Sequence, residues 1–138
     1  MKCALELAVT ADEAKKARIA VREKAVAENT IEWCETALNE DLEHAAKSEN
    51  HCCVYPIRFS PDGTEFIQLE SYVSQAGNSY YVDTNGWKNW SLLKSYLEQY
   101  CYKVEYKRSN LRCSNGYNFS EGALLTISFY PSDLECLN

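Results

Sequence analysis

Acidic side chains gather in one short part of the chain, between residues 28 and 49. This stretch holds seven acids against a single base, Lys47, so its net charge of −6 equals that of the whole 138-residue protein. Carboxylates in this number attract a basic protein surface, or a groove that otherwise holds nucleic acid. A solvated helix face without a partner is the alternative. The predicted partner-binding residues are Glu28, Glu32, Glu35, Glu40, Asp41 and Glu43.

A second group combines basic and aromatic side chains in the C-terminal half. Aromatic rings stack on nucleobases while Lys and Arg neutralise phosphate, so this combination indicates a pocket for a signalling nucleotide. Its few cations, on a protein of net charge −6, do not predict direct binding of duplex DNA. The predicted ligand-binding residues of this alternative are Tyr80, Tyr81, Trp87, Tyr102, Lys103, Tyr106, Lys107, Arg108 and Arg112.

The sequence carries none of the common catalytic or metal-binding motifs. It has no glycine-rich phosphate loop, and its two histidines, His44 and His51, stand in no recognisable catalytic context. The seven cysteines include no Cys-x₂₋₄-Cys knuckle, which structural zinc usually requires. We therefore expect no enzyme activity, no metal and no cofactor.

The N-terminus does not have the pattern of a secretory leader. Glu6 interrupts the apolar run that a leader needs, and no span approaches about 18 apolar residues. We therefore expect a cytoplasmic protein without membrane contact, whose cysteines are thiols because that compartment is reducing.

The composition divides the chain near residue 50. Of the 17 aromatic residues, 16 lie between Tyr55 and Tyr130, whereas the earlier part is rich in alanine, glutamate and lysine. Aromatic residues favour strands and the other three favour helix. The prediction is a single domain, 1–138, with a helical N-terminal element (10–49), an aromatic-rich α+β body (52–131) and a tail (132–138).

The start and the continuity of the N-terminal helix follow from capping patterns. Thr10 and Glu13 form a capping box, so the helix is expected to begin there. The alternation over residues 3–9 fits a short strand or a helical lead-in, and we favour the strand. Asn29, followed three residues later by Glu32, has the pattern of a second helix start. Two alternatives remain: a helical hairpin broken at Asn29-Thr30, or one uninterrupted helix.

An uninterrupted helix over residues 11–48 would be about 57 Å long, which is more than a body of about 90 residues can cover. That alternative predicts a homodimer in which a second copy covers the apolar side of the helix. The residues that this second copy would contact are Ala14, Ala17, Val21 and Ala25. Further along the helix, apolar residues recur at helical spacing and predict a buried stripe of Ile31, Cys34, Leu38, Leu42 and Ala45.

Beyond residue 51 the apolar period becomes two, and turns are indicated at Asp62-Gly63 and Asn85-Gly86. The predicted fold class is α+β, with the long helix or hairpin packed on a mostly antiparallel sheet of about four to six strands and one further helix near residues 90–100. The predicted strands cover residues 54–59, 66–73, 80–83, 102–108, 111–113 and 123–130, with a turn at 114–116.

Three segments give the chain a resemblance to a class of small proteins. They are Ala-Asp-Glu-Ala-Lys-Lys-Ala from Ala11, Thr-Ile-Glu-Trp-Cys-Glu-Thr-Ala-Leu from Thr30 and Leu-Lys-Ser-Tyr-Leu-Glu-Gln-Tyr-Cys-Tyr from Leu93. In style they resemble small proteins of bacterial phages and prophages, similar in kind to anti-CRISPR and other anti-defence inhibitors.

The resemblance implies a non-catalytic protein that binds and inhibits a host defence factor, such as a nuclease, in the cytoplasm of the bacterial host. The acidic residues and exposed tyrosines would form the contact. Two alternatives stay open: a protein that sequesters a signalling nucleotide, and a phage accessory protein with a structural role.

Overall fold

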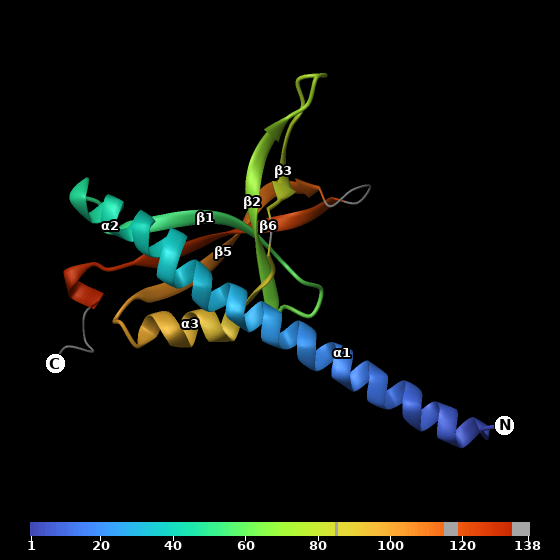
Figure 1. Ribbon diagram of the computed structural model, residues 1–138. Helices are drawn as coiled ribbons and strands as arrows, with labels where there is room; N and C mark the ends of the chain where they lie inside the picture. The colour runs from blue at the N-terminus through green and yellow to red at the C-terminus, as the bar shows by residue number, and fades with distance from the viewer. Residues whose placement is uncertain (85, 115–118, 134–138) are drawn as a thin grey trace.

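The N-terminal third of the molecule is one continuous helical rod (Figure 1). The computed structural model describes residues 1–84, 86–114 and 119–133. In it, α1 (Ala4–Trp33) passes into a π-helical turn, η1 (Cys34–Leu38), and then into α2 (Asn39–Lys47). The predicted long helix is present, with observed bounds of 4–47 in place of 10–49.

The strand expected over residues 3–9 is wrong, because this segment is already helical. The Cys3 backbone N–H donates to the Glu6 carboxylate (3.3 Å) just before the first turn. Thr10 lies inside the helix, where its hydroxyl donates to the Glu6 carbonyl (3.0 Å). Alanine and leucine favour helix strongly enough to extend it past the capping pattern at Thr10.

The break expected at Asn29-Thr30 does not occur, so the helical hairpin is excluded. Thr30 is fully buried, and its hydroxyl donates to the Val26 carbonyl (2.7 Å) and accepts the Asn89 backbone N–H (2.9 Å). A side chain typical of a helix start can bond within the helix instead when its other partner comes from a distant segment. Thr30 therefore joins the rod to the body.

The predicted apolar stripe of the rod is largely confirmed. Cys34, Leu38, Leu42 and Ala45 are buried, whereas Ile31 is half-buried. In a regular α-helix a residue four positions further on has rotated by about 40°. The wider π turn at Cys34–Leu38 offsets this drift and keeps the stripe directed toward the sheet.

The rest of the chain forms a mostly antiparallel sheet with one further helix, as predicted. The elements are β1 (Cys52–Phe59), β2 (Glu65–Val73), β3 (Ser79–Asp83), β4 (Lys88–Asn89), α3 (Trp90–Glu98), β5 (Lys103–Ser114), β6 (Phe119–Ser128) and the 3-10 helix η2 (Pro131–Asp133).

The strand bounds differ from the prediction in detail, and two predicted strands are joined. The strands expected at 102–108 and 111–113 are one strand, β5, with an irregularity between Ser109 and Arg112. The expected turn at 114–116 and the expected tail extend beyond the described residues.

Five of the strands close into a ring. The sheet order is β1-β6-β5-β3-β2-β4, and β1 also pairs with β2, from Ile57↔Gln68 to Phe59↔Phe66. The one parallel pairing joins β3 to β5 at Tyr81↔Cys113, and α3 lies in the connection between them, as a parallel pair requires. Ring closure leaves few open sheet edges.

The hydrophobic core lies between the ring and the helices that cover it. Leucines from η1, α2 and α3 meet inward-facing strand residues there. The largest fully buried apolar side chains are Phe66, Leu38, Ile57, Leu93, Leu125 and Ile127. This packing fixes η1 and α2 against the body, so that the outward side chains of these helices have defined positions.

The expectation that all seven cysteines are thiols is wrong for Cys101, which is disulfide-bonded. Its pairing could not be predicted because a disulfide depends on approach in space and not on spacing in sequence. Free thiols are present at Cys3, Cys34, Cys52, Cys53 and Cys113. None of the helices in the described part of the chain is both long and apolar enough to cross a bilayer.

Candidate functional site

A groove separates the outer side of η1 and α2 from the end of α3. It consists of two adjoining hollows of about 410 and 280 Å³, both lined by Asn39, Leu42, Tyr100 and Tyr102. Glu35 lines the larger hollow and Glu43 the smaller one. We call this the acidic-tyrosine groove and define it by Glu35, Asn39, Leu42, Glu43, Tyr96, Tyr100 and Tyr102.

The end of α3 positions the tyrosine side of the groove. Cys101 has a positive φ of 70°, the Tyr102 N–H donates to the Leu97 carbonyl (3.2 Å), and the Cys101 N–H donates to the Glu98 carbonyl (3.0 Å). This is the Schellman arrangement, in which a helix ends in one left-handed residue. It reverses the chain so that Tyr100 and Tyr102 both line the groove.

Tyr96 connects the two sides of the groove. Its hydroxyl donates to Glu35 Oε1 at 3.2 Å, and its ring lies 5.4 Å from that of Tyr100. Hydrogen bonding with Tyr100 is the main cause that raises the pKa of Tyr96 to about 12, with a further contribution from the charge of Glu35. The phenol is therefore protonated at neutral pH and can donate to Glu35.

The six predicted acidic residues all lie exposed on the rod, and we call them the acidic ridge. Among the described residues, the one ion pair that the ridge makes joins Glu28 to Lys24 at 4.0 Å, and both of these side chains are well exposed. Exposed pairs of this kind contribute little. The charge of the ridge is therefore almost uncompensated by the described part of the chain.

Asp41 is the ridge residue that connects the rod to the first strand of the sheet. The Tyr55 hydroxyl donates to Asp41 Oδ2 at 2.6 Å, which ties α2 to β1. Burial, followed by this hydrogen bond, raises the pKa of Tyr55 well above its usual value. Of the ridge residues, only Glu35 and Glu43 line the acidic-tyrosine groove.

The predicted ligand-binding residues do not gather in one pocket. Trp87 packs under the Arg58 guanidinium, 5.1 Å from its ring centroid, and Arg58 is buried and paired with Asp83. Tyr80 packs on Tyr72 at 4.9 Å. These residues serve the fold near β3, and Tyr81 pairs with Cys113 at the far end of β5 from Lys103.

The other predicted ligand-binding residues lie along β5, which is 12 residues long, except Tyr102, which lies just before it. Tyr102, Lys103 and Tyr106 line a hollow of about 720 Å³ between β5 and α3, and Tyr106 and Arg108 line a second one of about 390 Å³. Lys107 is exposed and lines neither hollow. Arg112 pairs with Glu121 in the sheet register.

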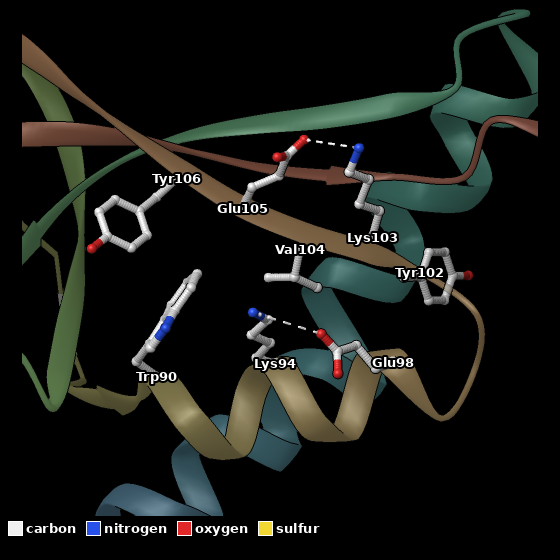
Figure 2. A pocket seen from close by; sticks show the side chains of 8 residues that line it. All are labelled: Trp90, Lys94, Glu98, Tyr102, Lys103, Val104, Glu105 and Tyr106. Atoms are coloured by element: carbon white, nitrogen blue, oxygen red, sulfur yellow. Dashed lines mark ion pairs between the residues drawn. The ribbon is translucent and has the colours of Figure 1, made fainter. Parts of the chain in front are cut away.

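The hollow of about 720 Å³ between β5 and α3 has almost no net charge. Figure 2 shows Lys94 paired with Glu98 on α3, and Lys103 paired with Glu105 on β5, at 3.9 and 3.6 Å. Trp90 and Tyr106 stand edge to face at one end, 5.2 Å apart. The two acids offset the two bases, of which Lys103 was predicted to contact phosphate, so this hollow has weak electrostatic preference for an anion.

The described residues hold no cluster of metal-binding side chains, and burial affects three of the thiols. No group of three or more His, Cys, Asp or Glu side chains in that part of the chain could hold a metal ion. Burial raises the pKa of Cys34 to about 11 and also raises the pKa values of Cys53 and Cys113. These thiols are protonated at neutral pH, and a protonated thiol is a poor nucleophile.

Sequence reasoning selected the acids of the groove but missed Tyr96 and Tyr100. Their spacing of four on a helix predicts that they neighbour each other, yet nothing in the sequence places them opposite Glu35.

Comparison of the chain with protein-family models, curated proteins and solved structures found no match.

Proposed function

We propose that this chain is a non-catalytic binding protein that inhibits a host defence factor, as anti-CRISPR proteins do, by capturing a basic surface of that factor. The observation that carries the proposal is the acidic-tyrosine groove, in which Glu35 and Glu43 face Tyr96, Tyr100 and Tyr102. A carboxylate pairs with an Arg or Lys side chain, and a tyrosine ring adds cation–π attraction. The partner is therefore a protein with protruding basic residues.

The location of the groove on packed elements favours this function. Leu42 lies buried beneath the groove and belongs to the core, so binding does not require the helix to become ordered. Preformed surfaces lose less entropy on association than mobile ones. The rest of the acidic ridge would add long-range attraction, which speeds association and weakens with salt.

A defence nuclease is the partner class that this chemistry fits. Its nucleic-acid surface is basic, and a groove that occupies this surface excludes the nucleic acid without cleaving anything. In this proposal the protein acts in the cytoplasm of the bacterial host.

The test compares two charge reversals of equal size. The groove variant carries Glu35→Lys and Glu43→Lys, and the control carries Glu13→Lys and Glu23→Lys on the exposed part of α1. Binding to a panel of purified defence nucleases of the host is measured by biolayer interferometry, and inhibition by nuclease assay. We expect the groove variant to weaken binding at least tenfold and to lose inhibition, and the control to change binding about twofold.

Two outcomes would contradict the proposal. Equal losses in both variants would mean that only net charge matters, and an unchanged groove variant would mean that the contact lies elsewhere. Tyr100→Ala gives a second measure of the groove, with an expected loss of about threefold from the missing cation–π contact.

A nucleotide-binding function is the second candidate, favoured by the aromatic end of the hollow between α3 and β5. Native mass spectrometry of protein purified from its host distinguishes the two functions, because it reports retained small molecules and co-purifying proteins in one measurement. A retained nucleotide would support the second candidate, and the Glu35→Lys/Glu43→Lys variant would then keep it.

A further inference from the structure

The N-terminal half of the helical rod, residues 4–25 of α1, has almost no contact with the rest of the molecule. Figure 1 shows it projecting away from the sheet and from α3, and every residue from Ala4 to Ala25 is exposed. Within the described residues, its one ion pair with the body joins Arg22 to Glu65 at 2.6 Å. A projecting helix of this length, about 33 Å, is only marginally stable in water unless something packs on it.

The projecting segment also carries aliphatic side chains that nothing covers. Leu7 is 55% exposed and Val21 is 71% exposed, and Leu5, Val9 and Ile19 are exposed as well. At about 100° per residue, Leu7 and Val21 lie on one face of this segment, whereas Leu5, Val9 and Ile19 lie on roughly the opposite face. Single exposed aliphatic residues are ordinary, so the face that could bind another protein is the one that Leu7 and Val21 share with a row of small residues.

Some of these residues belong to a seam with coiled-coil spacing. Cys3, Leu7, Thr10, Ala14, Ala17 and Val21 follow one another at alternating steps of four and three. The seam residues are small at its centre, which allows a second helix to approach closely. Successive residues lie about 100° apart on a helix, so the side chain of Val21 is turned well away from that of Arg22, which reaches the body.

Charge along the segment determines which partner and which orientation fit. Residues 4–13 carry three acids and no base, whereas residues 15–24 carry five bases against one acid. An antiparallel second copy places its basic half beside the acidic half of the first copy. Its acidic half then lies beside the basic half of the first copy. A parallel copy places like charges together, which is unfavourable.

We infer that the seam of α1 is an antiparallel homodimer contact. Two copies join through their projecting helices, bury the exposed side chains of Leu7 and Val21 at the seam, and hold their bodies at opposite ends of the helix pair. The two acidic-tyrosine grooves then belong to separate ends of one dimer. This inference does not depend on the proposed function, because the groove lies outside the seam.

Cross-linking through Cys3 tests the orientation. Cys3 is an exposed free thiol at the start of the seam, and an antiparallel partner places Val21 or Ala25 beside it. Val21→Cys and Ala25→Cys are made separately in the full chain and oxidised mildly. We expect at least one to give a covalent dimer on a non-reducing gel, at a level well above that of the unmodified protein.

The matched control adds Cys3→Ser to the same variant. Antiparallel pairing predicts that the cross-link disappears with Cys3. A cross-link that persists without Cys3, or a strong Cys3-dependent dimer of the unmodified protein, would show parallel or other contacts and overturn the inference. So would the absence of a cross-link in both variants.

Sedimentation velocity tests the dimer independently of oxidation. Ala14→Glu places a charge at the centre of the seam, whereas Ala8→Glu places it on a different side of the same exposed helix. We expect the unmodified protein and Ala8→Glu to sediment as dimers, and Ala14→Glu to raise the dissociation constant at least tenfold. A monomeric unmodified protein, or equal dissociation in the two variants, would overturn the inference.

Discussion

The two halves of the helical rod are both continuous helix, with a π turn only in the second half, but they differ in what surrounds them. Residues 4–25 are all exposed, whereas the second half buries Val26, Thr30, Cys34, Leu38 and Leu42, along with Ala45. Both halves are rich in residues that favour helix. The difference shows that helix formation in this chain follows local composition. The function of each half depends on what it contacts, which is the body for the second half and, in our inference, another copy of the chain for the first.

The largest expected contrast is in hydrogen exchange. Backbone amides of residues 26–47 should open only with global unfolding, because their side chains belong to the core, whereas amides of residues 4–25 should open locally at a cost of about 0–2 kcal/mol. Exchange followed by mass spectrometry at high and low protein concentration checks this. Slow exchange over residues 4–25 at every concentration would contradict the contrast, and slowing only at high concentration would sharpen it in favour of the dimer.

Matched leucine truncations give the next largest effect. Leu38→Ala removes a fully buried side chain and should lower the free energy of unfolding by about 3 kcal/mol. Leu5→Ala, at a position that is 74% exposed, should change it by less than about 0.5 kcal/mol. Chemical denaturation measures both values, and similar losses in the two variants would mean that the halves are packed alike.

Two threonines with the same local hydrogen bond give a smaller and more specific contrast. Thr30 and Thr36 both donate to the carbonyl four residues earlier at 2.7 Å, but only Thr30 is buried and accepts the Asn89 N–H. Thr30→Val leaves that N–H without its partner and should cost about 2 kcal/mol of unfolding free energy. Thr36→Val should cost less than about 0.5 kcal/mol. The hypothesis that Thr30 joins rod and body fails if the two losses are equal.

The smallest effect is expected at the boundary between the halves. Arg22 makes two hydrogen bonds to the Glu65 carboxylate, at 2.6 and 2.7 Å, but its side chain is 55% exposed. Arg22→Ala should lower the free energy of unfolding by about 0.5 kcal/mol at low salt and by less at high salt. Lys24→Ala, which breaks only an exposed pair, serves as control, and a large salt-independent loss at Arg22 would extend the packed half toward the N-terminus.

Much of the fold could be predicted because it follows from periodicity. The stripe from Cys34 to Ala45, the six-stranded and mostly antiparallel sheet and the helix after Asn89 all have local patterns. The errors lie where a local signal competes with context. Thr10 has the composition of a helix start, and so does Asn29 with Glu32, yet both lie inside the helix because helical neighbours continue on either side.

The candidate site was predictable only in part. Acidic residues at helical spacing indicated a charged face, and this face is exposed. Tyr96, which bonds Glu35, comes from α3, 61 residues later in the chain, and Tyr100 follows just after the end of α3. Their approach depends on how α3 packs on the core. The predicted ligand-binding residues do not form one pocket for a similar reason, because they lie along the extended strand β5 and on elements at its far end.

The sequence by itself determined the helical N-terminal part, the position of its excess negative charge and the change to aromatic strands, because composition and spacing act between near neighbours. Only the tertiary structure decided that the rod continues through Thr30, that its first half projects, and that Glu35 and Glu43 face tyrosines in and just after α3. These features depend on contacts between residues far apart in the chain, and the energy of such contacts comes from burial and hydrogen bonding that no local segment contains.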